Sequence, residues 1–344
     1  MDFQLAPDDS MKPDALDWKA LERLRATFLC GKAGECDYWQ SESDLASYDR
    51  TFAQRIGWKW DYVLEELKHR GWSPPLGELL DWGCGSGVAG RAFLDHFGVG
   101  SVARLCLWDR SPLAVEYAQR KARERFPDLA VRGLREAEPS LNHDASRATL
   151  ILSHVLTELN PAQADSLLTL ARSAQAVLWV EPGTHEASRA LIDAREQLRS
   201  GFRVVAPCTH PAACGMLANE NARHWCHHFA PSPPEIFTDG EWARFAHLAG
   251  LDLRSLPLSF LVLDKRPLAP LPAGAVRVIG RPRVQKAQAL IFACDSSGVR
   301  DRRLMKRKLP AEFARLKKGE VDSLQIWRLE GDEIVEAKHS ASTS

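Results

Sequence analysis

The sequence predicts an α/β fold in which helices cover both faces of a mostly parallel β-sheet. Two observations predict it. From Glu78 onward, short apolar runs alternate with amphipathic stretches, and a glycine-rich segment joins the first run to the first stretch. Strands that alternate with helices favour parallel pairing with helices on both sides. At 344 residues the chain is long enough for one large domain with additions or for two domains.

The apolar runs are the predicted strands and the amphipathic stretches the predicted helices. We expect strands at residues 79–80, 102–108, 149–152 and 176–180, and helices at 88–97, 112–125, 161–172 and 185–199. Pro112 and Pro161 fall in first helical turns, where proline is tolerated. Residues 1–75 form a helical preface, since apolar residues recur at spacings of three and four between Leu45 and Leu67.

The second half of the chain is less regular. Residues 200–234 are rich in Cys, His, Pro and Asn without clear periodicity, and long stretches of this kind are usually functional. A helix capped at Thr238-Asp239 follows, then strand-like segments at 256–263, 275–279, 289–293 and 323–327. We therefore expect a helical region (1–75), a core (76–200), a cysteine-containing segment that completes the core (201–264) and a small basic β-rich module (265–344).

Composition limits the class of protein. Hydrophobic residues make up 45% and charged residues 26%, near the averages for soluble proteins, and no apolar run is long enough to span a bilayer. The acidic residues 1–15 fit neither a secretory signal nor a transit peptide, so we expect a cytoplasmic location and no membrane partner. In a reducing compartment, eight cysteines indicate metal or redox chemistry rather than disulfides.

Positive charge is concentrated near the C-terminus. The net charge is zero, yet residues 265–318 hold fifteen Lys or Arg and three acidic residues. A polyanionic partner is therefore expected, although a charge run is often only a solvated face. The candidate RNA-binding residues are Arg281, Arg283, Lys286, Lys306, Arg307 and Lys308.

The glycine-rich segment, residues 81–87 with sequence DWGCGSG, indicates a nucleoside ligand. Glycines let the backbone turn sharply and approach a ligand, and the start of the next helix offers free N–H groups. Asp109 ends the second predicted strand, where a carboxylate can accept both ribose hydroxyls. The spacing G-x-G-x-G differs from the dinucleotide fingerprint and resembles the motif of class I S-adenosylmethionine-dependent methyltransferases. The alternative is a turn that only packs tightly.

Cofactor binding is better supported than methyl transfer. The candidate cofactor-binding residues are Asp81, Gly83, Gly85, Gly87, Asp109 and Ser153. Many amino-directed methyltransferases carry an Asn/Asp-Pro-Pro-aromatic run after the fourth strand, and this chain has SHVL at residues 153–156 instead. His154 is either a general base or, more often for a lone histidine, a structural residue. No catalytic residue is assigned.

Three cysteines in the irregular segment, Cys208, Cys214 and Cys226, predict a metal site. Cys294, at the end of an apolar run, is the expected fourth ligand. Four thiolates suit zinc or a 4Fe-4S cluster. The gaps of five, eleven and sixty-seven residues favour the cluster, because structural zinc sites usually contain a shorter gap. Nearby histidines leave a mixed zinc site open: His210, His224, His227 and His228.

The other cysteines are interpreted as ordinary residues, which is also the alternative for the four above. Cys84 and Cys106 are predicted to be buried. Cys30 and Cys36 have no assigned role, and packing within the helical region is favoured for both.

The chain resembles the methyltransferase-like assembly factors of the small ribosomal subunit, which occur in mitochondria and bacteria. The resembling parts are residues 80–87, 207–229 and 276–286 together with Cys294, within a region from about Tyr48 to Trp327. The resemblance implies a 4Fe-4S cluster on Cys208, Cys214, Cys226 and Cys294, S-adenosylmethionine at residues 81–87, and association with small-subunit ribosomal RNA during assembly.

Three functions remain open from the sequence. The first is a cluster-bearing assembly factor that binds ribosomal RNA and S-adenosylmethionine. The second is an active ribosomal RNA methyltransferase. The third is a small-molecule methyltransferase with a structural zinc site.

Overall fold

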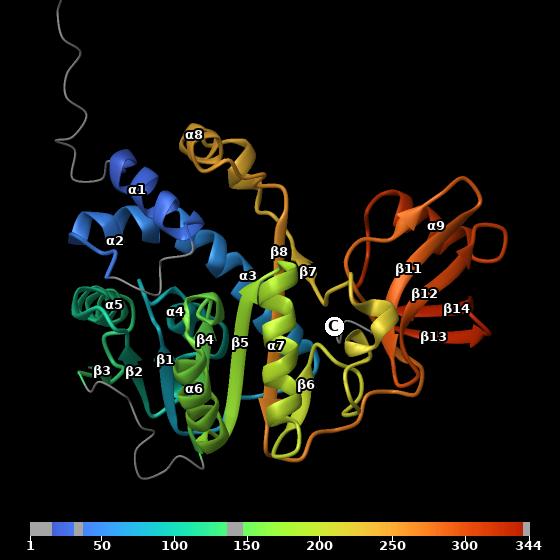
Figure 1. Ribbon diagram of the computed structural model, residues 1–344, viewed down its shortest axis with the longest axis horizontal. Coiled ribbons are helices and arrows are strands. Elements are labelled where there is room, and N and C mark those ends of the chain that lie inside the picture. Colours follow the sequence, from blue (N-terminus) through green and yellow to red (C-terminus); the bar gives the residue numbers. More distant parts are fainter. Residues whose placement is uncertain (1–15, 31–36, 136–146, 340–344) are drawn as a thin grey trace, which may run out of the picture.

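The computed structural model describes residues 16–30, 37–135 and 147–339. Its first sheet has the strand order β3-β2-β1-β4-β5-β8-β6, and β7 pairs with β8 (Figure 1). Strands β1 to β5 are parallel, whereas β8 is antiparallel to β5, β6 and β7. The strands are β1 (Glu78–Trp82), β2 (Arg104–Trp108), β3 (Val131–Gly133), β4 (Thr149–Ser153), β5 (Ala176–Pro182), β6 (Arg203–Ala206), β7 (His228–Ala230) and β8 (Leu256–Asp264).

Helices cover both faces of this sheet, as predicted. Alternate strand residues face opposite ways, so Leu79 packs with α3 (Phe52–His69), α4 (Val88–Phe97) and α5 (Pro112–Arg125). Leu80 packs on the other face with α6 (Pro161–Ser173) and α7 (His185–Leu198). This strand order, with its one antiparallel strand beside the edge, is that of the class I S-adenosylmethionine-dependent methyltransferase fold. The predicted fold class is confirmed.

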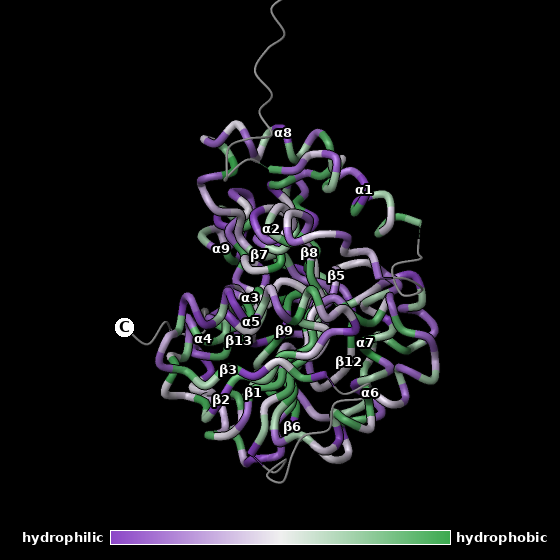
Figure 2. Tube along the Cα trace, turned by 90° about the vertical axis from the view of Figure 1, so that its left-hand side faces the viewer, coloured by the Kyte–Doolittle hydropathy of each residue, from purple (hydrophilic) through white to green (hydrophobic). Residues whose placement is uncertain are grey.

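The N-terminal helices lie over one end of the sheet (Figure 1). The periodic stretch from Leu45 to Leu67 is not one helix, because the chain turns at Arg50-Thr51 between α2 (Glu42–Asp49) and α3. Helix α1 (Trp18–Leu29) packs against α8 (Gly240–Ala249), and α2 packs against α5. Figure 2 shows the apolar residues concentrated in the strands in the middle of the molecule.

The second sheet is a small barrel. Its strand order is β10-β11-β12-β14-β13-β9, and a further pairing of β11 with β9 closes five strands into a ring. Strands β12 and β14 are parallel and the other pairs antiparallel. The elements are β9 (Ala275–Val278), β10 (Arg283–Val284), β11 (Gln288–Asp295), β12 (Gly298–Met305), α9 (Pro310–Lys317), β13 (Leu324–Glu330) and β14 (Glu333–His339).

This connectivity is that of an OB-fold, a five-stranded barrel with a helix between its third and fourth strands. Here α9 takes that place, and Phe313 of α9 packs into a core with Ile291, Leu304 and Trp327. The sequence predicted a β-rich module without indicating that its strands close. Strand β12 was missed because charged residues interrupt its alternation. Arg302 points into the barrel and is buried.

Among the described residues, no helix combines the length and the apolar character that crossing a membrane requires.

Candidate functional site

The glycine loop follows β1 at the carboxyl end of the sheet. The backbone N–H groups of Gly83 and Cys84 both donate to the carbonyl of Trp108, at 2.8 and 2.9 Å. Gly83 has φ 71°, and a Cβ there would lie 2.8 Å from a methyl of Val155. Gly87 has φ 80°, and its Cβ would lie 2.9 Å from Ala118. Both conformation and close packing therefore require glycine at these two positions.

Asp109 and Asp81 occupy different places around this loop. Asp109 accepts the N–H of Gly85 at 2.9 Å and that of Ser111 at 3.0 Å, so its carboxylate lies beside the loop. Asp81 is fully buried and accepts the N–H of Gly90, one of the donors at the start of α4 that lack a helical partner. Burial raises the pKa of Asp81 to about 7. Asp81 thus fastens α4 to β1.

Ser153 ends β4 and His154 follows it, next to helix α3. The hydroxyl of Ser153 accepts the indole N–H of Trp60 at 3.0 Å. His154 has φ 57°, an uncommon conformation for a non-glycine residue, and its Nε2 lies 3.5 Å from Nζ of Lys59. Burial, followed by the charges of Lys59 and Arg55, holds the pKa of His154 well below its usual value. The imidazole is therefore neutral at pH 7.

Several buried polar atoms around this edge of the sheet lack a hydrogen-bond partner among the described residues. They are Oδ1 of Asp81, Oγ of Ser86 and Oε2 of Glu181. Buried polar atoms normally have partners, so such a concentration is typical of a site for a ligand or ordered water. Two carboxylate oxygens that accept hydrogen bonds and one hydroxyl that can donate or accept are suited to a polar ligand such as a nucleoside.

The four candidate cysteines come together between the two sheets. Cys208, Cys214 and Cys226 lie in the segment that Figure 1 draws in yellow beside the barrel, and Cys294 lies at the end of β11. Burial and then the charges of the other three thiols raise the pKa of Cys226. Burial and then Cys208 also raise the pKa of Cys214, to about 11. The four sulfur atoms are thus within electrostatic range of one another.

Contacts with both domains hold the cysteine segment. Arg195 of α7 donates to the carbonyl of Ala212 at 2.9 Å, and the hydroxyls of Ser188 and Ser259 both donate to the carbonyl of Cys226 at 2.7 Å. On the barrel side, a Cβ at Gly215 would lie 2.9 Å from the backbone nitrogen of Val299. The segment therefore bridges α7 and the β11–β12 face of the barrel.

The neighbouring histidines divide into two pairs. His210 and His228 approach thiols, with Nε2 3.4 Å from Sγ of Cys294 and 3.7 Å from Sγ of Cys226 respectively. The other two lie on aromatic rings, at centroid distances of 4.6 Å for His224 with Phe292 and 4.8 Å for His227 with Trp225. In the described part of the chain, no three His, Cys, Asp or Glu side chains are arranged to hold a single metal ion.

The remaining cysteines lie apart from this cluster. Cys84 and Cys106 are buried, as predicted. The packing expected for Cys30 is wrong, because Cys30 is exposed at the end of α1 and its thiol donates to the carbonyl of Thr27. Cys36 lies outside the described residues.

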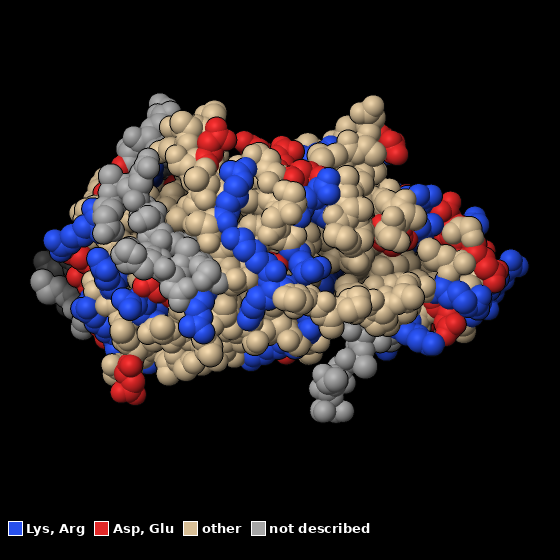
Figure 3. Space-filling view, turned by 90° about the horizontal axis from the view of Figure 1, so that it is seen from below, with Lys and Arg blue, Asp and Glu red and all other residues tan. Residues whose placement is uncertain are grey.

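All six candidate RNA-binding residues are exposed on the barrel. Arg283 pairs with Asp301 at 2.5 Å and Lys308 with Glu333 at 2.7 Å. Arg281 lies over the ring of Phe229 at 4.3 Å. Lys306 is near the ring of Phe313, and Lys286 and Arg307 make no ion pair with any described residue. Figure 3 shows basic and acidic side chains interspersed at the barrel end of the molecule.

A buried ion network that the sequence did not reveal joins α3 to the barrel. The two terminal nitrogens of the Arg277 guanidinium, Nη1 and Nη2, donate to the carboxylate of Glu66, and Arg70 pairs with the same carboxylate at 2.8 Å. Arg277 also donates to the carbonyl of Pro207 at 2.8 Å. The two Arg residues hold the pKa of Glu66 below its usual value despite its burial. Arg277 pairs in register with Cys294, so the network lies next to the cysteines.

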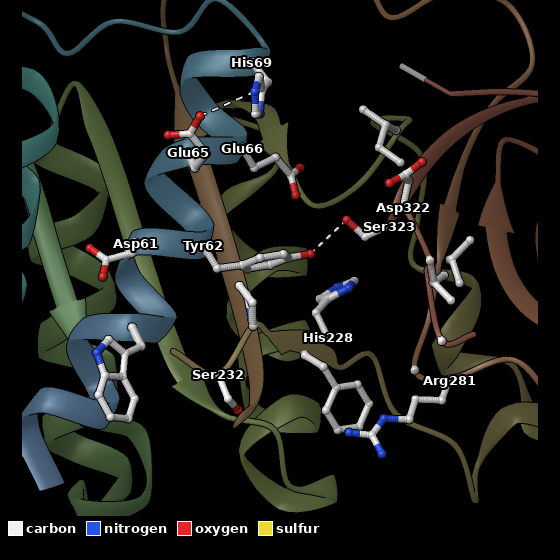
Figure 4. A pocket seen from close by; sticks show the side chains of 18 of the residues that line it. Asp61, Tyr62, Glu65, Glu66, His69, His228, Ser232, Arg281, Asp322 and Ser323 are labelled. Carbon is white, nitrogen blue, oxygen red and sulfur yellow. Dashed lines mark hydrogen bonds and ion pairs between the residues drawn. The ribbon is translucent and has the colours of Figure 1, made fainter. Parts of the chain in front are cut away.

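A cavity of 1110 Å³ opens beside this network, between α3 and the barrel. Tyr62 crosses it and donates to the hydroxyl of Ser323 at 2.8 Å, while His228 and Arg281 line its other side (Figure 4). The cavity therefore lies at the joint between the two domains, away from the glycine loop.

The sequence model of one family, described as mitochondrial small ribosomal subunit Rsm22, matches residues 61–327. This chain belongs to the Rsm22 family. The match includes the glycine loop and all four cysteines of the cluster, and it confirms the resemblance on which the expected function rested. No curated protein matches the sequence of this Rsm22-family member.

Solved structures similar to this Rsm22-family protein include two methyltransferases. Magnesium protoporphyrin IX methyltransferase from Synechocystis PCC 6803 with bound SAM is 15% identical, with 74% of this chain and 100% of that chain covered and a TM-score of 0.40. A putative RNA methyltransferase from Pyrococcus horikoshii is 13% identical, with coverages of 66% and 84% and a TM-score of 0.34. At these scores neither activity nor ligand carries over to this chain.

Proposed function

We propose that this Rsm22-family protein is a cytoplasmic factor of the small ribosomal subunit with three binding functions. It binds small-subunit ribosomal RNA through its barrel and S-adenosylmethionine at the glycine loop. It also carries a 4Fe-4S cluster on Cys208, Cys214, Cys226 and Cys294. The observation that carries the proposal is the gathering of these four thiols, three from the core and one from β11, at the joint between the two domains.

The chemistry of the cysteine site supports an iron–sulfur cluster. Four thiolates bring several negative charges into a largely buried place, and Arg195 and Arg277 supply positive charge beside them. Each thiolate of a cubane cluster binds a different iron atom, so the four sulfurs need not converge on one point as they do around zinc. Bound there, the cluster supplies a rigid inorganic link between the core and the barrel.

The topology of the barrel supports single-stranded RNA as the partner. OB-folds bind oligonucleotides on their second and third strands and on the adjoining loops. Those strands are β11 and β12 here, and the cysteine segment covers part of their outer face through Gly215 and His224. The loop between β9 and β11 stays accessible and carries Arg281, Arg283 and Lys286.

We expect the double variant Lys286→Ala/Arg307→Ala to bind small-subunit RNA with a weaker salt dependence. Each phosphate contact removed lowers the slope of log K against log salt by roughly 0.7 for single strands. Filter binding or fluorescence anisotropy across a salt series measures the slope. Lys68→Ala, which removes an exposed lysine from α3 of the core, serves as the matched control. An unchanged slope in the double variant contradicts the role of these cations.

We expect Asp109→Ala to weaken binding of S-adenosylhomocysteine by about tenfold or more, because the ribose hydroxyls lose a charged acceptor worth roughly 1.5–3 kcal/mol. Isothermal titration calorimetry measures the affinity. Asp95→Ala, which changes an exposed carboxylate on α4, is the control. Equal affinity of the native and Asp109→Ala proteins contradicts the ribose contact.

Transfer of labelled methyl groups to purified small-subunit RNA distinguishes this factor from an active RNA methyltransferase. The alternative requires label in the RNA, whereas the proposed binding function requires none.

A further inference from the structure

Helix α3 places two basic side chains, Arg55 and Lys59, one turn apart beneath the end of β4. Lys59 is only 7% exposed. Neither residue forms an ion pair with an acidic side chain of the described residues, and Nε of Arg55 is a buried donor without a partner. Among the residues that the structure describes, the Lys59 ammonium makes one polar contact, with Nε2 of His154 at 3.5 Å.

These two cations are close to the glycine loop by way of the end of β4. Lys59 contacts His154, and a methyl of Val155, the next residue, lies 2.8 Å from where a Cβ at Gly83 of the loop would be. Trp60 next to Lys59 is hydrogen-bonded to Ser153. These contacts fix α3 across the junction between the loop and the end of β4.

Burying a cation without a counter-charge is costly, and such a cation normally has a partner. Burial and then the charge of Arg55 lower the pKa of Lys59 to about 7. Burial and then the charge of Arg25 lower the pKa of Arg55 to about 10. The charge of Glu181 acts on Lys59, but the two residues form no ion pair in the described part of the chain, and Oε1 of Glu181 accepts from Trp179 and from the backbone N–H groups of Val155 and Leu156. Arg55 and Lys59 therefore offer a binding site for an anion that the described residues do not supply.

We propose that Arg55 and Lys59 bind the carboxylate at the amino-acid end of S-adenosylmethionine. The inference rests on the proposed cofactor site and extends it. With the ribose at Asp109 beyond β2, the rest of the cofactor runs across the glycine loop toward β4, where the two cations lie. A phosphate of the RNA backbone is the poorer occupant, because a polynucleotide does not reach a side chain as buried as Lys59.

Two nucleosides that differ only at that end test the inference. S-Adenosylhomocysteine has the amino-acid group, and 5′-methylthioadenosine keeps the adenosine and the thioether without it. Calorimetric titrations of the native full chain, Lys59→Met, Arg55→Met and the control Lys68→Met give the affinities. We expect Lys59→Met and Arg55→Met each to bind S-adenosylhomocysteine about 10- to 100-fold more weakly. Methylthioadenosine affinity should change by less than about twofold in all variants.

The outcomes separate this inference from the proposed function. If the native protein binds neither nucleoside, the cofactor site itself is refuted, and the carboxylate contact with it. If S-adenosylhomocysteine binds the native protein but Lys59→Met and Arg55→Met leave its affinity unchanged, or weaken both nucleosides equally, only the carboxylate contact is refuted. A loss of RNA affinity in Lys59→Met with nucleoside binding intact also overturns it and assigns the cations to phosphate. Circular dichroism melting confirms that each variant is folded.

Discussion

We expect Glu66→Leu to lower the free energy of unfolding by about 3–5 kcal/mol, the usual cost of removing one partner from a buried ion pair. Without the carboxylate, the guanidinium of Arg277 stays 1% exposed and loses its ion-pair partner among the described residues. Arg70 loses the same carboxylate, and both arginines then keep only uncharged acceptors in the described part of the chain, such as the carbonyls of Val205 and Pro207 for Arg70 and that of Pro207 for Arg277. Urea denaturation followed by tryptophan fluorescence measures the loss.

The double variant Glu66→Leu/Arg277→Met separates charge from packing. Replacing both members of a buried pair with apolar residues is often neutral, so the double variant should regain most of the lost stability. Glu65→Ala, an exposed neighbour on the same helix, should change stability by less than about 0.5 kcal/mol. A loss below about 1 kcal/mol in Glu66→Leu would show that water or a shifted Arg277 replaces the carboxylate.

The elements of the core were predictable because each depends on local pattern. The amphipathic repeat and a first-turn proline define α5 and α6, and the structure begins both helices at Pro112 and Pro161, as expected. The glycine loop was equally local, since strand, glycines and helix follow one another within residues 78–97. The short strands β6 and β7 were missed because they are three or four residues long and depend on pairing with β8.

The parts that were not predictable depend on contacts between distant residues. Glu66 and Arg277 are 211 positions apart, and neither has a sequence signature of burial. The burial of Lys59 was only weakly indicated by the sequence. This lysine lies next to the apolar residues Ile56, Trp60 and Val63, which form a buried face of α3. Closure of the barrel was also hidden, because it depends on two residue pairs between β9 and β11.

The cysteine segment combines a feature that local pattern predicted with contacts between distant residues that it did not. Its thiols were found from composition and spacing, but the structure adds that the segment lies on the β11–β12 face of the barrel, with Gly215 against Val299. Other links between the domains are the Glu66–Arg277 network and the hydrogen bond from Tyr62 to Ser323. If a cluster forms at the thiols, its binding free energy adds to the docking of the barrel, since a metal site of this kind couples binding to folding.

We therefore expect Cys294→Ser to lose the cluster and to loosen the barrel. Cys294 is the one ligand candidate contributed by the barrel. Its loss should weaken binding of the cluster by more than the roughly 10- to 100-fold that is typical of outer-sphere substitutions. Iron and acid-labile sulfide per chain should fall accordingly. Without the link, proteolysis within residues 265–274, between β8 and β9, should become faster. Iron and sulfide analysis of anaerobically purified protein and limited proteolysis measure the two effects.

Cys30→Ser is the matched control, because that thiol is exposed on α1 and should affect neither iron content nor proteolysis. The two readouts also distinguish the role of the cluster from that of the ion network. Loss of iron with unchanged proteolysis would mean that Glu66 and Arg277 suffice to hold the barrel, and the linking role of the cluster would fail. Full retention of iron in Cys294→Ser would remove Cys294 from the ligand set, leaving His210, 3.4 Å from its sulfur, as the nearest replacement.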